Sequence, residues 1–342
     1  MNKKKELILP PRESIDPQSH PIVTRRYTLI TPMIEALLAE AVQWITNGVT
    51  GALIIGEPRR GKTKGRRLLA KLLAVNFPGL PVFSMIAMCY DHTSERVFFG
   101  DLLKAFKHSM HAEGTAAQRR DRLLEGIVSA VQASGQDRVV LLVDQAHYLL
   151  EMHYHWLVDL HDVLSERGIE LFVFFFGQPE LSAVCEELRR AGKTQILGRF
   201  MVDRLQYFGI RSIKELRGCL KAYDEKAFYP EGSDWSFSRY YFPRAFEAGW
   251  CLARLAPMFW KAFDEVRRHG AVSAAMEVPM QHFVRMVERF FLECSDIETL
   301  DPKISQEQLN KFVASTLFAS IPRDQSPDTD DDSDSDPARD EP

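Results

Sequence analysis

The segment GEPRRGKT at positions 56–63 fits the pattern GxxxxGK[ST], in which a glycine-rich turn joins a buried strand to a helix. Residues 52–55 before it are a short apolar run, and residues 68–75 after it have the pattern of a helix. Glycine lets the backbone turn sharply, so that its N–H groups approach phosphate oxygens near the positive end of the helix. The segment therefore predicts a phosphate-binding loop; the alternative is a glycine turn without chemical significance.

The residue types of this loop suit a nucleotide that binds together with magnesium. We expect Lys62 to reach the β- and γ-phosphates and the hydroxyl group of Thr63 to bind the magnesium ion. The residues predicted to bind the nucleotide are Gly56, Glu57, Pro58, Arg59, Arg60, Gly61, Lys62, Thr63 and Lys64. The sequence leaves open whether the basic residues here face the nucleotide, a neighbouring molecule, DNA or solvent. These residues are Arg59, Arg60, Lys64, Arg66 and Arg67.

A second apolar run supplies the acidic residue that a magnesium site needs. Residues 139–143 are all apolar, and Asp144 follows directly, 81 residues after Thr63. At the end of a neighbouring strand, Asp144 would hold the magnesium ion together with Thr63; otherwise it only ends the strand in a turn. The next residue, Gln145, orients a water molecule by hydrogen bonding but cannot accept its proton at neutral pH. We therefore predict ATP binding with slow hydrolysis.

Apolar runs without polar alternation, separated by helical patterns, indicate an α/β fold with a parallel sheet covered by helices on both faces. The predicted strands are 52–55, 82–88, 139–143, 171–176 and 205–210. The predicted helices of this region are 29–45, 68–75, 97–106, 119–133 and 149–167. Beyond residue 210 only helical patterns follow, and they predict a smaller helical C-terminal domain. These patterns lie at 212–225, 246–269 and 278–292.

Composition sets the outer boundaries of these domains. Residues 1–22 are polar and contain four prolines, and we predict that they form an extended arm. Residues 316–342 are predicted to be a disordered acidic tail, because its last 22 residues contain Asp, Ser and Pro but no aromatic residue. Between them we expect the sheet-containing core at 23–210 and the helical domain at 211–315.

Charge and residue content exclude several other classes of protein. The net charge is −4, but residues 321–342 hold nine acidic and two basic residues, so the rest of the chain carries +3. A mildly basic body is compatible with a polyanionic partner. The five cysteines lie far apart, which argues against a zinc site or a disulfide framework. No apolar stretch reaches transmembrane length without charges, so we expect a soluble, cytoplasmic protein without a membrane partner.

Histidines gather near the predicted helix 149–167 without forming a metal site. No two of them are three or four residues apart, the spacing that sets neighbouring ligands on one helical face. They are His147, His153, His155 and His161. We therefore predict no metal other than Mg²⁺.

The assembled motifs resemble AAA+ ATPases, and within them the transposition regulators of the TnsC/TniB type, which are near relatives of the ExeA-like ATPases. The resemblance covers roughly residues 23 to 260. It is carried by GEPRRGKT at 56–63, VVLLVDQAH at 139–147, FFFGQPEL at 174–181, ILGRF at 196–200 and Phe242-Pro243-Arg244. It implies that the C-terminal helical domain is the lid of an AAA+ core.

The resemblance also implies roles for single residues. Gln178 stands where the family keeps the sensor-1 residue that contacts the γ-phosphate, and with Gln145 and Arg199 it completes the implied catalytic set. Arg199 stands in the position of the arginine finger that reaches a neighbouring subunit's nucleotide, with Arg204 as a rival. Arg244 matches the sensor-2 arginine of the lid.

Finally, the resemblance implies assembly of ATP-bound subunits on duplex DNA and recruitment or activation of a transposase, together with a target-selection protein. The family's DNA-facing segment follows the second strand, where cations attract DNA without reading its sequence. The candidate DNA-binding residues are Thr93, Arg96, Lys104, Lys107, Arg119 and Arg120. Two alternatives remain: an ExeA-like secretion-associated ATPase, and a nucleotide-gated AAA+ scaffold or switch with little hydrolysis.

Overall fold

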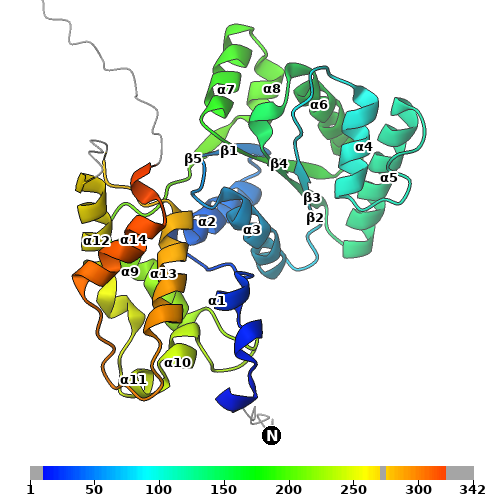
Figure 1. The fold of residues 1–342 in the computed structure, drawn as a ribbon. Coiled ribbons are helices and arrows are strands. Elements are labelled where there is room, and N and C mark those ends of the chain that lie inside the picture. The colour runs from blue at the N-terminus through cyan, green and yellow to red at the C-terminus, as the bar shows by residue number, and fades with distance from the viewer. Residues whose placement is uncertain (1–10, 270–274, 321–342) are drawn as a thin grey trace, which may run out of the picture.

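The computed structural model describes residues 11–269 and 275–320, which fold into a sheet-containing core and a helical lobe beside it (Figure 1). The predictions for residues 1–10 and 321–342, including most of the acidic tail, lie outside the described residues. Among the described helices, none combines the length and the apolar character that a membrane span requires.

The core contains a five-stranded sheet in the order β2-β3-β4-β1-β5, and all its strand pairs are parallel. The strands are β1 (Gly51–Ile55), β2 (Val82–Ile86), β3 (Arg138–Asp144), β4 (Glu170–Gly177) and β5 (Asp203–Gln206). Ile55 lies beside Gly177, and Asp144 lies beside Phe176. The carboxyl ends of β1, β3 and β4 therefore meet at one edge of the sheet, where the predicted site residues follow.

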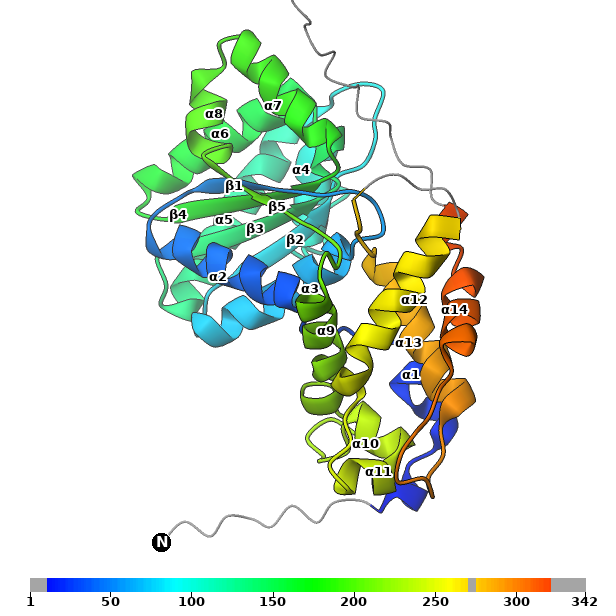
Figure 2. The ribbon, with the colours of Figure 1, turned by 90° about the vertical axis from the view of Figure 1, so that its left-hand side faces the viewer.

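Helices cover both faces of the sheet, as Figure 2 shows, which confirms the predicted fold class. On one face, Trp44 and Leu73 pack with strand residues such as Phe174; on the other, Phe99 and Leu157 pack with residues such as Phe175. Because both faces are buried, neighbouring residues of a central strand are all apolar. The first face carries α2 (Pro32–Thr46) and α3 (Lys62–Asn76), and the second carries α4 (Glu95–Ala105), α5 (Ala116–Ser134), α6 (Glu151–Glu166), α7 (Glu180–Arg190) and α8 (Thr194–Phe200).

The predicted fifth strand, 205–210, is displaced from its actual position. Strand β5 begins at Asp203 and ends at Gln206, and Asp203 also accepts a hydrogen bond from the indole of Trp44 at 2.9 Å. This strand lies at the edge of the sheet and pairs only with β1. An edge strand does not need apolar residues on both faces, so the prediction followed the later apolar residues, beginning two residues late and ending four residues late.

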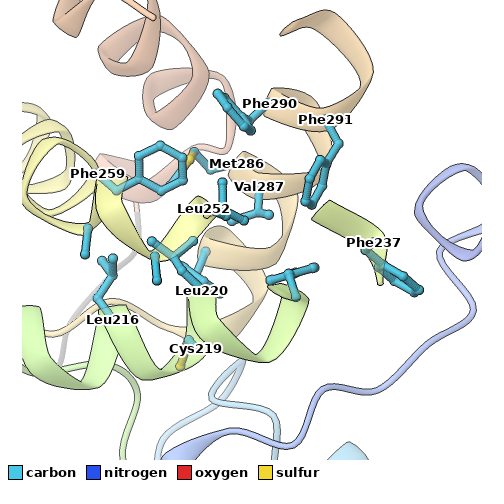
Figure 3. Close-up of a cluster of buried hydrophobic side chains, with 14 of the residues drawn as sticks. Leu216, Cys219, Leu220, Phe237, Leu252, Phe259, Met286, Val287, Phe290 and Phe291 are labelled. Carbon is cyan, nitrogen blue, oxygen red and sulfur yellow. The ribbon is translucent and has the colours of Figure 1, made fainter. Parts of the chain in front are cut away.

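The helical lobe is held together by a cluster of aromatic and aliphatic side chains, which Figure 3 shows between several helices. Phe259, Met286 and Phe290 are fully buried in it. The lobe contains α9 (Ile213–Glu225), α10 (Phe237–Tyr241), α11 (Pro243–Glu247), α12 (Ala256–His269), α13 (Met280–Cys294) and α14 (Gln306–Ser315). Phe318 belongs to the same cluster, so ordered structure continues past the boundary that we placed at residue 315.

The described part of the expected extended arm, which starts at residue 11, is instead folded onto the helical lobe. Residues 11–24 form three short helical turns, which are η1 (Arg12–Ser14), η2 (Pro17–Ser19) and α1 (Pro21–Thr24). His20 stacks on Tyr240 with ring centroids 4.5 Å apart, and Ile22 is fully buried in the lobe's cluster. Proline and polar residues suggested an extended segment, but the apolar side chains between them find partners more than 200 residues away in the chain.

Candidate nucleotide-binding site

The loop between β1 and α3 has the conformation that its glycines allow. A Cβ atom on Gly56 would lie 2.2 Å from the carbonyl oxygen of Tyr207, so only glycine fits there. Gly61 has φ of 96°, in the left-handed region that glycine adopts without strain, and α3 begins at the next residue. The first N–H groups of α3 therefore point toward the space in front of the loop.

Lys62 is folded back onto the loop. Its Nζ donates hydrogen bonds to the carbonyl oxygens of Gly56 and Glu57, the latter at 2.8 Å. Burial, together with the nearby charge of Arg60, lowers the pKa of Lys62 to about 8. A phosphate group would favour the ammonium form and replace neutral carbonyl partners by charged oxygens.

Asp144 ends β3 with both carboxylate oxygens engaged. Its Oδ1 accepts a hydrogen bond from the backbone N–H of Gln145 at 3.0 Å, and its Oδ2 accepts one from Nε of Arg66 at 3.2 Å. The side chains of Arg66 and Asp144 are only 5% and 6% exposed. This buried ion pair was not foreseen from the sequence.

A cavity of about 500 Å³ lies between the phosphate-binding loop, the ends of the strands and the helical lobe. Thr63, Lys62 and Asp144 line it together, so a hydroxyl and a carboxylate oxygen face the same space as the lysine. Hard oxygen ligands of this kind fit Mg²⁺, and the loop's N–H groups and Lys62 fit a phosphate chain. The further predicted residues in the lining are Pro58, Arg59, Gly61, Lys64, Gln145 and Gln178.

The far wall of the cavity comes from the N-terminal segment and α13. Lys64 donates to the carbonyl of Tyr27 at 3.1 Å, and the hydroxyl of Tyr27 donates to Oε1 of Glu288 at 3.1 Å. Burial raises the pKa of Glu288 above its usual value. Arg285 lines the cavity from the same helix. Sequence reasoning missed these residues because nothing in the chain links positions 27 and 288.

Arg60 points away from the cavity, toward the helical lobe. Its Nη2 lies 2.6 Å from Oε2 of Glu277, and the two side chains are 15% and 17% exposed. Glu277 also accepts a hydrogen bond from the backbone N–H of Gly209, where the chain passes from core to lobe. Nearby, Gln281 N–H donates to the carbonyl of Arg59 at 3.2 Å. We call these contacts the loop–lobe clamp. They connect the phosphate-binding loop to the helical lobe and to Gly209, where the chain leaves the core.

Gln178 and His147 meet at the cavity wall. The backbone N–H of Gln178 donates to Nδ1 of His147 at 3.4 Å, and the side-chain nitrogen of Gln178 lies 3.3 Å from Nε2 of His147. Burial lowers the pKa of His147, which favours the neutral ring. Gln145 has φ of 56° and lies exposed at the cavity. His147 was counted in the sequence only as one of several scattered histidines.

Besides Arg60, two other predicted arginines lie outside this cavity. Arg244 lies in α11 and pairs with Glu298, so the lid arginine that lines the cavity is Arg285 instead. Arg199 binds Asp162 through two hydrogen bonds of 3.0 and 3.1 Å and keeps 31% of its side chain exposed. To reach a neighbouring subunit, Arg199 must first leave this carboxylate.

The candidate DNA-binding residues differ in their environment. Arg119 is buried and donates to the carbonyls of Arg96, Ala112 and Glu113, so it holds the α4–α5 connection together and cannot face DNA. Arg120 pairs with Glu95 at 3.0 Å. The candidates that remain exposed are Thr93, Arg96, Lys104 and Lys107.

A glycine-rich loop, a strand-end aspartate and a helical lobe lie around one cavity, which is the arrangement of a P-loop domain. Residues 48–185 match the family model of the AAA domain. The matched residues include strands β1 to β4 of the parallel sheet. No protein of curated function matches this chain in sequence.

Solved structures share weak similarity with most of the chain. The ORC2 protein of Aeropyrum pernix, in ADPNP and ADP complexes, is 13% identical, with 88% of this chain and 98% of that chain covered and a TM-score of 0.44. CDC6p from Pyrobaculum aerophilum is 14% identical, with 88% and 89% covered and a TM-score of 0.41. Thermotoga maritima RuvB T158V is 13% identical, with 84% and 69% covered and a TM-score of 0.37.

Proposed function

We propose that the protein binds ATP with Mg²⁺ in this cavity and hydrolyses it slowly. The observation that carries the proposal is that the loop at 56–63 and Asp144, far apart in sequence, face one cavity that the helical lobe closes. Lys62 would leave its two carbonyl partners and bind the phosphates. Thr63 and Asp144 would hold the magnesium ion, which neutralises phosphate charge and orients the phosphate chain.

Slow hydrolysis follows from what the chain offers to an attacking water. Gln145 lies exposed at the cavity and orients water without removing its proton. Gln178, which contacts His147 just beyond the neighbouring strand β4, would contact a terminal phosphate. Neither side chain is a general base at neutral pH, so turnover is limited by proton removal.

Calorimetry with Mg-ATP tests the binding step. Lys62→Ala should abolish measurable binding, because it removes the cation buried in the loop. Lys71→Ala, on the exposed part of the same helix, is the matched control and should bind as the unmodified protein does. Absence of any ATP binding by folded, unmodified protein, or equal binding by Lys62→Ala, would contradict the proposal.

We further propose that the ATP-bound protein oligomerises on duplex DNA without sequence preference and recruits or activates a transposase, together with a target-selection protein. Support comes from the resemblance in residues 56–63, 139–147 and 174–181 to transposition regulators. The exposed Lys104 and Lys107 offer cations for phosphate contacts.

Gel shift with plain duplex DNA, with and without ATP, tests the DNA step, and electron microscopy of the same mixtures tests assembly. We expect binding that needs ATP and falls steeply with salt. Equal weak binding in all nucleotide states would favour the alternative of a nucleotide-gated scaffold, which Gln145 also supports.

A further inference from the structure

Arg66 occupies a position that the proposed chemistry does not require. It lies in α3, three residues after Thr63, and its side chain is buried against Asp144 at 3.2 Å. Arg67, next to it on the same helix, is exposed and has no ion pair within the part of the chain that the structure describes. The helix therefore aims one of two adjacent arginines at the one carboxylate that would hold magnesium.

The charges around Asp144 oppose binding of a free divalent cation. Arg66 supplies one fixed positive charge in contact with the carboxylate, and Lys62 is close enough to interact with it electrostatically. Both positive charges repel a divalent cation that approaches this carboxylate, and the repulsion is stronger in a partly buried site than in water. A bound triphosphate would make the net charge around Asp144 negative, because it brings about four negative charges to the same cavity.

We infer that Arg66 is a positioning residue for Asp144 that keeps magnesium out of the site until a triphosphate is present. It holds Oδ2 of the carboxylate through Nε, while the N–H of Gln145 holds Oδ1, so the ligand is oriented before the metal arrives. Magnesium then enters together with the nucleotide and not ahead of it. This inference rests on the proposed function.

Magnesium titration of the nucleotide-free protein, followed by thermal unfolding and calorimetry, tests the inference. Arg66→Gln keeps a hydrogen-bond donor and removes the charge; we expect it to bind MgCl₂ at least tenfold more tightly than the unmodified protein. Arg66→Lys keeps the charge and should bind MgCl₂ as weakly as the unmodified protein. Arg67→Gln is the matched control and should change nothing. Magnesium affinity within twofold of the unmodified protein in Arg66→Gln, or an equal change in Arg67→Gln, would overturn the inference.

Nucleotide binding in EDTA separates this inference from the proposed function. Unmodified protein and Arg66→Gln should both bind ATP, since Lys62 and the loop are unchanged. If the unmodified protein binds no ATP even when MgCl₂ is present, the proposed function is wrong. If it binds ATP and Arg66→Gln leaves the magnesium affinity unchanged, only the role of Arg66 is wrong. If both Arg66 variants fail to fold while Arg67→Gln folds, the ion pair is structural and the inference is also wrong.

Discussion

The loop–lobe clamp makes a quantitative prediction through Glu277. Its carboxylate lies 2.6 Å from the guanidinium of Arg60, and more than four fifths of each side chain is buried. Glu277→Gln keeps the shape but removes the charge, which leaves the Arg60 guanidinium facing a neutral amide in a largely dehydrated place. Charged hydrogen bonds of this kind contribute about 1.5–3 kcal/mol, and removing one partner costs at least as much.

We therefore expect Glu277→Gln to lower the free energy of unfolding by about 2 kcal/mol. For a domain of this size that corresponds to a fall in melting temperature of roughly 4–8 °C. Urea unfolding and calorimetry measure both quantities. The matched control is Glu125→Gln, because the Glu125–Arg167 pair is mostly exposed and should contribute little.

A double-mutant cycle isolates the contact from the other neighbours of these residues. Combining Glu277→Gln with Arg60→Met should cost clearly less than the sum of the two single changes, with a coupling of about 1–2 kcal/mol. ATP affinity should fall in Glu277→Gln as well, since the clamp fixes the loop that carries Lys62. Additive single effects, or a variant as stable as the unmodified protein, would refute the clamp.

Three further predictions address turnover, assembly and pH. Gln145→Glu supplies the missing base and should raise the ATPase rate at least about tenfold, measured by phosphate release. An unchanged rate would show that proton removal from water does not limit hydrolysis. Arg199→Ala should leave ATP binding intact and weaken ATP-dependent assembly in light scattering, while normal assembly would exclude it as the finger. Burial lowers the pKa of His20 to about 4, so the folded protein favours the neutral ring. The contribution of His20 to the free energy of unfolding is therefore complete above its unfolded pKa of about 6.5. It falls by up to about 3 kcal/mol as the pH falls toward 4. In urea unfolding, His20→Gln should lose less stability over this pH range than the unmodified protein.

The central strands could be predicted from the sequence because a strand buried on both faces consists of consecutive apolar residues. Strands β1, β3 and β4 are continuous apolar runs, and the prediction placed each within one residue of its ends. The edge strand β5 lacks such a run of apolar residues, since its Asp203 and Arg204 are polar and exposed. The folded arm escaped prediction for a related reason, because short turns take their stability from packing and not from periodicity.

The candidate site divides in the same way. Local pattern sufficed to predict that Lys62 and Thr63 follow a turn and that Asp144 ends a neighbouring strand. It could not predict that Arg60 faces Glu277, 217 residues away, or that Arg119 is buried under carbonyls. The sequence identifies a residue as basic but does not tell whether its side chain binds DNA, contacts loop carbonyls or pairs with a carboxylate. Its partner depends on the fold.

Three cations near the loop, Arg60, Lys62 and Arg66, have partners within the chain, and those partners differ in kind. Arg60 and Arg66 face carboxylates, whereas Lys62 faces the neutral carbonyls of Gly56 and Glu57. A neutral acceptor holds an ammonium less tightly than a carboxylate holds a guanidinium, so Lys62 is the cation that a phosphate recruits most easily. The two arginines then retain their carboxylates and join the loop region to two different parts of the molecule: Arg66 contacts Asp144, and Arg60 contacts Glu277. On this account Arg60 does not contact the nucleotide but connects the phosphate-binding loop to the helical lobe through Glu277.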